Sequence, residues 1–449
     1  MKHLLGVGQS SMRWGLCSLC LMVLAACGGS DEPGARPAAM TDLPDTPQTE
    51  ELVLWQSALL RETSPSVSAA ELRATAESVS RFGSMVFGAW ASRPENAGLN
   101  LVFSPLSLYS PLLMAQAGAE NETLRQMSAA LQLPVPREQA NVGFNALDLE
   151  LESRGVLPND GTLRNVNGLF LATSQIAQPA YLDVLAVNFV AGVVPIETST
   201  ADGAEASRVA VNAWFEAQTS GKFPEFLSPG ALVDARLVIA NAVTFKGAWK
   251  QAFDPSLTKT GDFVLLSGES IQTQFMEQSV TAAVTQDSIY DAVGLSFMGE
   301  DFVFQVVVPK AGQFQTVEAA IRADPGRDFL ESASPAFVRV VMPKFNVDTA
   351  LSTEDLLIQL GMVDAFDPTR ADFSGIDGTR LLHISKVIHK AAINVDEKGA
   401  EASAGSAVVL TPPNVPGETV AIDRPFFFAI RDAKTGVVAF MGRVMNPTL

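Results

Sequence analysis

The sequence predicts an α+β fold in which helices dominate the first part of the chain and strands the second. From residue 69 apolar residues recur every three or four positions, whereas beyond residue 235 they form continuous or alternating runs. Strand and helix patterns do not alternate regularly, so a parallel βαβ architecture is not expected. With 449 residues, of which 47% are hydrophobic, the chain can bury a large core.

The first 26 residues have the form of an export signal. Lys2 and Arg13 precede an apolar run at residues 14–26 that is too short to span a membrane comfortably. The run ends in LAAC, which resembles the bacterial lipoprotein signal in which Cys27 becomes the lipidated first residue. We expect an exported cell-envelope lipoprotein that faces the periplasm or the extracellular space, attached to the membrane through lipid on Cys27. An ordinary signal peptide with a chance cysteine is the alternative.

The next elements follow in order along the chain. Residues 28 to about 50 are rich in Gly, Pro, Ala, Asp and Thr and predict a flexible tether. Residues 51–70 fit either a short docking helix or a membrane-proximal segment, so we assign 27–68 to the anchored linker and 69–449 to the folded domain. One helix is expected from Ala69 and a second at Ser104-Pro105, because a small polar cap followed by proline suits a first helical turn. Later strands are predicted at 237–245, 302–308, 338–341, 426–430 and 437–440, with a helix at 352–360.

Residue counts exclude several classes of function. The formal charge is -18 and basic residues form no dense cluster, so nucleic acid is not an expected partner. The only histidines are His3, His383 and His389, and the sequence has no GxSxG, no HExxH, no pair of CxxC motifs and no P-loop. A surface hydrolase is therefore a weak alternative, and we expect no enzyme activity, no metal and no cofactor.

Separated segments of the chain resemble the serpin superfamily, and they occur in the family's order. The most specific is NAVTFKGAW at 241–249, close to the serpin pattern N-A-x-x-F-K-G-x-W. The others are NLVFSPLS from residue 100, NGLF from 167, VNAWFE from 211, MPKF from 342, SKVIHKA from 385, RPFFF from 424 and FMGRV from 440. The match spans roughly residues 72–447. It implies three β-sheets, eight or nine helices and an exposed reactive-centre loop at about 397–424.

The resemblance also implies a mechanism. A serine-type endopeptidase, or alternatively a cysteine endopeptidase, would attack a loop carbonyl and form an acyl-enzyme. This acyl-enzyme is trapped when the cleaved loop inserts into the main β-sheet. The expected partner is thus a target protease, and the inhibitor is expected to act as a monomer. The alternative is a non-inhibitory serpin that acts as a binding or chaperone-like surface protein.

The residues of the predicted loop suit this mechanism. The hinge comprises Glu397, Lys398, Gly399, Ala400, Glu401, Ala402, Ser403, Ala404, Gly405 and Ser406. Small residues tolerate several backbone conformations. In an extended strand the even-numbered side chains from 400 to 410 would share one face and are all small or apolar, whereas Glu401 would lie on the other face. A charged or bulky residue at Ala402 or Ala404 is expected to slow insertion.

The reactive bond is placed by counting along the chain. The family interval from Glu397 indicates Pro413-Asn414, whereas counting back from Pro425 indicates the next bond. Most serine proteases accept proline poorly before the cut, which leaves the position open within 410–415. The candidates are Pro413 and Asn414, with Leu410, Thr411 and Val415 as alternatives. No Arg or Lys lies between residues 398 and 424, so an elastase-, chymotrypsin- or subtilisin-like target is favoured over a trypsin-like one.

Five further positions match serpin residues that act during sheet opening. Ser104, Ser107, Asn241 and His389 match a hydrogen-bonded gate beneath the sheet, and Trp249 matches an aromatic residue at the place where the loop enters. Helix capping and ordinary core packing are the alternative roles of these residues.

Overall fold

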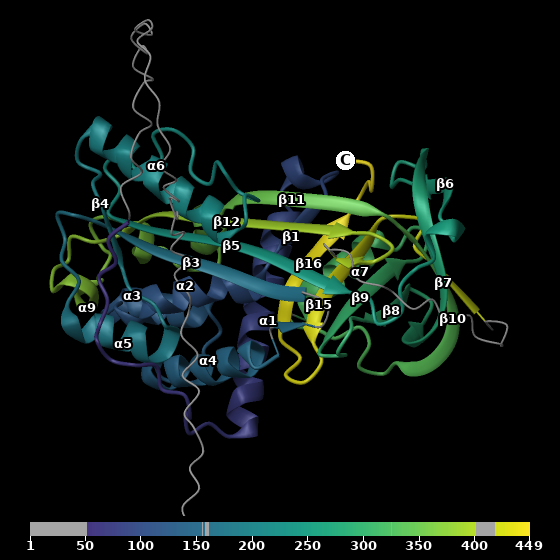
Figure 1. Cartoon of the computed structure of the whole chain (residues 1–449), viewed down its shortest axis with the longest axis horizontal. Coiled ribbons are helices and arrows are strands. Elements are labelled where there is room, and N and C mark those ends of the chain that lie inside the picture. The colour runs from purple at the N-terminus through teal and green to yellow at the C-terminus, as the bar shows by residue number, and fades with distance from the viewer. Residues whose placement is uncertain (1–51, 155, 158–160, 325, 401–417) are drawn as a thin grey trace, which may run out of the picture. The chain divides into compact units, whose positions relative to one another are not determined.

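The computed structural model describes residues 52–154, 156–157, 161–324, 326–400 and 418–449 (Figure 1). Within these ranges the helices are α1 (Ala69–Ala91), α2 (Pro105–Ala117), α3 (Asn121–Ala130), α4 (Arg137–Glu152), α5 (Pro179–Phe189), α6 (Ala201–Gln218), α7 (Phe314–Ala323), α8 (Glu354–Gln359) and α9 (Ser374–Asp377). Short 3-10 turns lie at Pro94–Asn96, Pro255–Leu257 and Asp364–Phe366. No helix in the described part of the chain is long and apolar enough to cross a membrane.

Within the described residues the main sheet has seven strands, and it carries the candidate site. Its strands are β11 (Phe345–Ser352), β12 (Ile384–Val395), β13 (Gly399–Ala400), β5 (Leu237–Ala248), β3 (Gly161–Ala172) and β2 (Val156–Leu157) in this order, with β4 (Val194–Ile196) paired to β3. Helix α6 covers one face and α2 contacts β3 and β5 on the other (Figure 1). Because both faces are covered, β5 is apolar along most of its length rather than strictly alternating.

The other nine strands of the described residues form one ladder. Their order is β1 (Leu101–Phe103), β16 (Val438–Val444), β15 (Phe426–Asp432), β9 (Phe302–Pro309), β8 (Tyr290–Ser296), β7 (Ser270–Gln286), β10 (Ser334–Pro343) and β14 (Glu418–Ala421), with β6 (Lys259–Val264) paired to β7. Strand β7 is long enough to have three partners. Its first part pairs with β6, its longer second part with β10 and its end with β8. The second and third sheets that were expected are thus two parts of one ladder, which is continuous through β7. The predicted α+β class is confirmed.

Both predicted helix starts are capped, as the sequence suggested for Ser104-Pro105. Ser68 and Glu71 form a capping box at the start of α1, in which the Ser68 hydroxyl accepts from the Glu71 N–H and the Glu71 carboxylate accepts from the Ser68 N–H. At α2 the Ser104 hydroxyl accepts from the Ser107 N–H at 3.1 Å, and Pro105 occupies the first helical position.

Residues 52–68 form no helix and instead lie extended against the folded domain. The N–H and C=O of Trp55 pair with those of Val193 at 2.8 and 2.9 Å. Arg61 donates to Asp148 at 2.7 Å and to Glu152 at 2.8 Å, both on α4. A docking helix and a membrane-proximal segment were the two roles considered for residues 51–70. The described residues of this segment dock on the folded domain, but in an extended conformation. Their polar groups find partners on α4 and α5.

Candidate functional site

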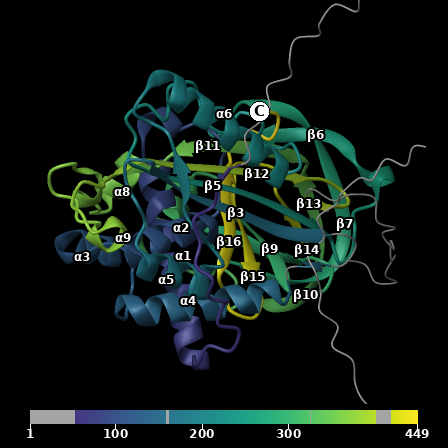
Figure 2. The same cartoon turned by 60° about the vertical axis from the view of Figure 1, so that its left-hand side comes forward.

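The hinge residues begin a strand inside the main sheet. After β12 the chain turns through Asp396, whose carboxylate accepts from the N–H groups of Lys398 and Gly399 at 2.8 and 3.3 Å. It then returns as β13, which is labelled in Figure 2. The pairing places β13 between β12 and β5, antiparallel to both. Ala400 is opposite Val395 on one side and Gly247 on the other, and its side chain is fully buried. The two hinge residues that form β13, Gly399 and Ala400, are thus already part of the sheet.

Beyond β13 the two neighbouring strands pair directly with each other. Strand β12 runs parallel to β5, with Ala392 opposite Thr244 and His389 opposite Asn241. A longer inserted strand would have to separate this pairing one residue after another, because both strands would then bond to the new strand instead. The position for a new strand between β12 and β5 is therefore filled by β13 at one end and closed along the rest by direct pairing of the two strands.

Trp249 lies directly beneath the hinge turn. Its backbone N–H donates to Lys398 O and its indole Nε1 donates to Asp396 O, both at 2.9 Å. The side chain is buried and stacks on Phe297, with ring centroids 4.7 Å apart. The two roles considered for Trp249 are therefore compatible, since a core residue also fixes the turn from which the loop departs.

Glu397 ties the hinge turn to the neighbouring ladder. Its carboxylate lies 3.0 Å from Lys344 Nζ and accepts from the Thr258 hydroxyl at 2.8 Å. Burial by itself would raise the pKa of Glu397, but the hydrogen bonds from Lys344 and Thr258 outweigh it and hold that pKa below its usual range. Lys344 stands in the MPKF segment, but nothing local to that segment or to the hinge indicates that the Lys344 and Glu397 side chains meet.

The four predicted gate residues lie together under the main sheet. The Ser104 N–H, at the start of α2, donates to His389 Nε2 on β12 at 3.1 Å. Because Nε2 accepts, the imidazole proton is on Nδ1, which donates to Asn241 Oδ1 on β5 at 2.7 Å. Ser104 also accepts from Ser107 in its capping interaction. The Ser104 hydroxyl thus caps α2 while its N–H belongs to this network, and the His389–Asn241 bond joins the two strands that an inserted strand would have to separate.

Two further members of this network, Asn165 and Asn167, were not predicted from the sequence. The Asn241 amide donates to Asn165 Oδ1 at 2.8 Å and to Asn167 Oδ1 at 2.5 Å, both on β3. Asn167 stands in the NGLF segment, but a hydrogen bond across strands depends on sheet register that the segment alone does not reveal. The network therefore links α2 to three strands, β12, β5 and β3.

We expect the gate histidine to make stability depend on acid pH. Complete burial lowers the pKa of His389 from 6.5 to about 3. The unfolded chain binds the proton between these values and the folded protein does not, so stability should be full above pH 6.5 and fall toward pH 3, by up to about 1.4 kcal/mol per pH unit. Urea unfolding midpoints at several pH values will measure this slope.

His389→Gln should flatten that dependence, because glutamine can hydrogen-bond but does not titrate. His383→Gln is the matched control, since His383 is only half-buried and lies outside the gate. Equal slopes for wild type and His389→Gln would contradict the assignment of the acid sensitivity to this residue.

The predicted residues from Glu401 to Ser406, the reactive-bond candidates between 410 and 415, and Cys27 all lie outside the described residues. Those that the structure describes fall into two neighbouring groups on the main sheet, the hinge with Trp249 and the gate around His389.

Comparison with known proteins identifies the fold. Residues 77–447 match the family described as Serpin (serine protease inhibitor). The chain belongs to the serpin family. It is 35% identical over 353 residues to an uncharacterised serpin-like protein of Thermococcus kodakarensis, covering 78% of this chain and 81% of that protein. It is 30% identical over 364 residues to the leukocyte elastase inhibitor of Bos taurus, covering 78% of this chain and 94% of that protein.

A solved structure agrees with the fold. The native state of the thermophilic serpin tengpin superposes with a TM-score of 0.76 and 23% sequence identity, covering 88% of this chain and all of that one. The resemblance that the segments predicted is therefore confirmed for family and fold. Serpins are in general protease inhibitors rather than enzymes, and a protease is accordingly the class of partner that the family indicates.

Proposed function

We propose that this serpin is a suicide-substrate inhibitor of serine-type endopeptidases, with cysteine endopeptidases as a further class, which traps the acyl-enzyme by loop insertion between β12 and β5. The observation that carries the proposal is β13. Its residue Ala400 is already buried between these strands, and among the hinge residues that follow it through Ser406 only Glu401 is larger than serine. Insertion would extend a strand that has already begun.

The register of β13 predicts what each later residue would meet. Continued in the same antiparallel register, Ala404 would lie opposite Val243 on β5 and Ala391 on β12. Val243 and Ala391 are fully buried and belong to the same hydrophobic core as Ala400. We therefore expect the even-numbered hinge residues to enter the core on insertion, which accounts for their small apolar side chains.

The same register would bring Ser406 between His389 and Asn241. A hydroxyl can donate one hydrogen bond and accept others, so Ser406 could bond to both gate residues once insertion has separated them. On the opposite face Glu401 would lie beside Lys246 of β5, where its carboxylate meets an opposite charge. In both placements the inserted residue would give a polar or charged side chain of the neighbouring strands a hydrogen-bonding or ionic partner.

For the reactive bond we propose Pro413-Asn414, with Leu410, Thr411 and Val415 as alternative positions. The absence of Arg and Lys between residues 398 and 424 supports an elastase-, chymotrypsin- or subtilisin-like target over a trypsin-like one. The leukocyte elastase inhibitor among the relatives is compatible with this choice.

The deciding experiment mixes the purified domain, residues 51–449, with elastase, chymotrypsin and subtilisin in separate reactions. We expect a covalent complex of summed mass that survives denaturing electrophoresis for at least one enzyme, and mass spectrometry of the released C-terminal peptide would identify the cut bond. Cleavage of the loop by all three enzymes without any complex would reject inhibition and favour the non-inhibitory alternative.

Gly399→Ala should displace the hinge strand from the sheet. A Cβ at this position would lie 1.9 Å from Gly247 O, so the backbones of β13 and β5 cannot keep their spacing. We expect a loss of about 1–3 kcal/mol of stability and a several-fold rise in the fraction of inhibitor that is cleaved without forming complex. Titration of the target enzyme measures that fraction as moles of inhibitor used per mole of enzyme inactivated.

Gly98→Ala is the control for this substitution, because no atom would lie within 4 Å of its added Cβ. The interpretation would fail if Gly399→Ala used no more inhibitor per enzyme than Gly98→Ala does.

We further propose that the protein is exported, is attached to the cell envelope through lipid on Cys27, and acts there as a monomer. The proposal rests on the LAAC segment and on the absence of any other cysteine beyond residue 27. Cys27→Ser should move the protein from the membrane fraction to the soluble fraction, and retention in the membrane fraction would reject the anchor.

A further inference from the structure

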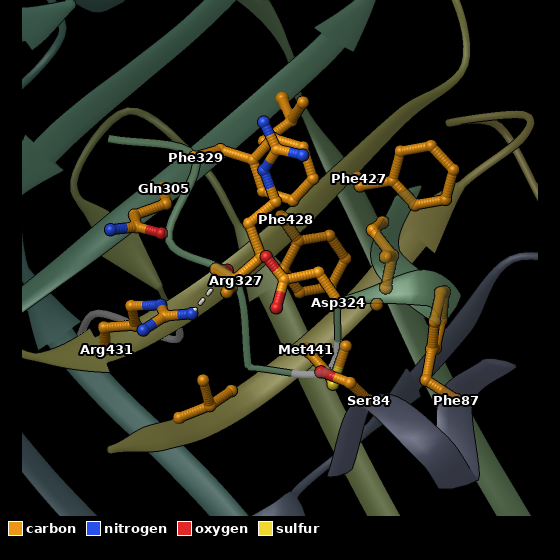
Figure 3. Close-up of a pocket in the computed structure, with 15 residues that line it drawn as sticks. Ser84, Phe87, Gln305, Asp324, Arg327, Phe329, Phe427, Phe428, Arg431 and Met441 are labelled. Atoms are coloured by element: carbon orange, nitrogen blue, oxygen red, sulfur yellow. Dashed lines mark hydrogen bonds between the residues drawn. The ribbon is translucent and has the colours of Figure 1, made fainter. Parts of the chain in front are cut away.

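Most large apolar side chains of the domain point inward. Figure 3 shows an example in which Phe87, Phe427 and Phe428 line a small cavity between α1, α7 and strands β9, β15 and β16. Residues 52–68, here called the docked segment, have the opposite arrangement, because several of their large apolar side chains point into solvent. Exposed apolar residues that occur singly need no explanation, but a cluster of them often marks an interaction site.

The docked segment turns polar groups toward the domain and leucines away from it. The Arg61 side chain is largely buried and pairs with two carboxylates of α4, and the Ser57 hydroxyl donates to Asp183 of α5. By contrast, the side chains of Leu59 and Leu60 are 53% and 87% exposed. A segment that docked only to cover the core would have the reverse pattern, with leucines inside and arginine outside.

Backbone contacts gather the exposed residues beside the end of α5. Trp55 pairs with Val193, shortly beyond the helix, and the Glu62 N–H donates to Val187 O in its last turn at 3.1 Å. The chain between these contacts therefore runs along the C-terminal half of α5. The exposed aliphatic residues here, which we call the apolar patch, are Val53, Leu54, Leu59, Leu60 and Val190.

Val190 belongs to this patch through an unusual backbone conformation. It ends α5 with φ 53° and ψ 38°, in the left-handed region that β-branched residues rarely adopt. Its side chain is 65% exposed, so packing within the domain offsets little of the strain. Glycine or asparagine would fit this helix end without strain. A strained conformation that the core does not require points to a role at the surface.

The apolar patch lies where the chain enters the domain from the proposed lipid anchor. Leu52, the first described residue, follows Cys27 by 25 positions, from 27 to 52. A flexible chain of this length, as the composition predicts, has a root-mean-square span of about 28 Å. Lipid on Cys27 would therefore keep the patch near the bilayer, where a high local concentration makes weak contacts effective.

We propose that the apolar patch rests on a zwitterionic lipid surface and inserts its aliphatic side chains among the lipids. A bilayer surface would take these side chains out of water, as it does for interfacial protein segments. The net charge of -18 disfavours a strongly anionic surface. The contact would fix which face of the domain is turned toward the membrane. This inference rests on the proposed anchor at Cys27 but not on protease inhibition.

The test uses residues 28–449 with an N-terminal hexahistidine tag, bound to phosphatidylcholine vesicles that contain a nickel-chelating lipid. Because the chain has no cysteine beyond residue 27, Ala58→Cys provides a single site for a fluorophore in the docked segment. Ser332→Cys, in the loop before β10, is the control site, since β10 and α5 lie at opposite ends of the domain (Figure 1).

We expect brominated lipid to quench the fluorophore at position 58 at least fivefold more than at position 332. Equal quenching at the two positions would overturn the proposal. Because the tag replaces the lipid, this outcome would leave the Cys27 anchor untouched, and a failure of lipidation would not affect the measurement.

Substitutions in the patch separate lipid contact from attachment. Leu59→Ser combined with Leu60→Ser should lower the quenching at position 58 at least fivefold without lowering the unfolding temperature, because both side chains are exposed. Leu266→Ser, in the hairpin between β6 and β7, is the matched control and should change nothing, although Leu266 is 50% exposed. Unchanged quenching in the double variant would overturn the proposal.

Val190→Asn should raise the unfolding temperature and lower the quenching at position 58 about twofold, because it relieves the backbone strain and removes an aliphatic side chain. A purely structural role for Val190 would not connect these two changes, so a stabilised variant with full quenching would contradict its place in the lipid contact. Sedimentation of the untethered protein tests the other occupant. Dimers that the double leucine variant abolishes would assign the patch to a second copy of the chain and overturn the proposal.

Discussion

Ala404→Glu is expected to convert the inhibitor into a substrate that the target protease cleaves and releases. In the proposed register the new carboxylate would enter between Val243 and Ala391, both of which have no exposed surface. An unpaired charge in such a place costs several kcal/mol, so insertion would slow relative to hydrolysis of the acyl-enzyme. Because each 1.4 kcal/mol is a factor of ten, we expect the yield of covalent complex to fall roughly tenfold or more. Denaturing gels of timed reactions will give the ratio of complex to cleaved inhibitor.

Ser403→Glu is the matched control, because alternation in a strand places Ser403 on the opposite face from Ala404. It adds the same charge one residue away in the loop and should preserve most of the complex. Equal losses in the two variants would show that charge in the loop, rather than burial of one face, impairs inhibition, and the proposed register would be wrong.

Cleavage of the loop alone should raise the unfolding temperature of the protein. Insertion would bury the side chains of Ala402, Ala404, Val408 and Leu410 and would pair a new strand on both sides. At about 0.8 kcal/mol per buried methylene this burial is worth on the order of 7 kcal/mol, and the new backbone hydrogen bonds on both sides of the strand offset the entropy of ordering it. For a domain of this size that corresponds to a rise of roughly 10 °C. Calorimetry of intact and nicked samples will measure the difference.

Nicked Ala404→Glu should show a much smaller rise, since its loop cannot insert fully. A nicked wild-type sample that unfolds at the same temperature as the intact protein would refute insertion, although the fold itself would stand. Hydrogen exchange of the new chain end offers an independent readout, because amide groups in a central strand exchange slowly.

Local patterns predicted much of the fold. The helices that begin at Ala69 and Pro105 follow from apolar spacing and from capping residues, which act within a few positions of one another. The strands β5, β9 and β10 follow from apolar runs in the second half of the chain. Strand β3, in the first half, was not predicted, because its mixed sequence TLRNVNGLF has neither a continuous apolar run nor clean alternation.

The candidate site was predicted less completely, for the same physical reason. His389 and Asn241 were named from their motifs, but their partners Asn165 and Asn167 were missed, and so was the pairing of Glu397 with Lys344. These contacts join residues between 53 and 76 positions apart in the chain. Local sequence carries no information on which of many possible registers brings such residues together.

The sequence by itself determined the serpin family, the α+β class and the run of small residues after Glu397. Only the tertiary structure decided that the hinge strand begins between β12 and β5, and that Ala400 faces the core. It also decided that His389 and Asn241 meet beneath the main sheet. Composition and periodicity depend on neighbours along the chain, whereas strand register, burial and charge pairing depend on neighbours in space, which are set only when the whole core has packed.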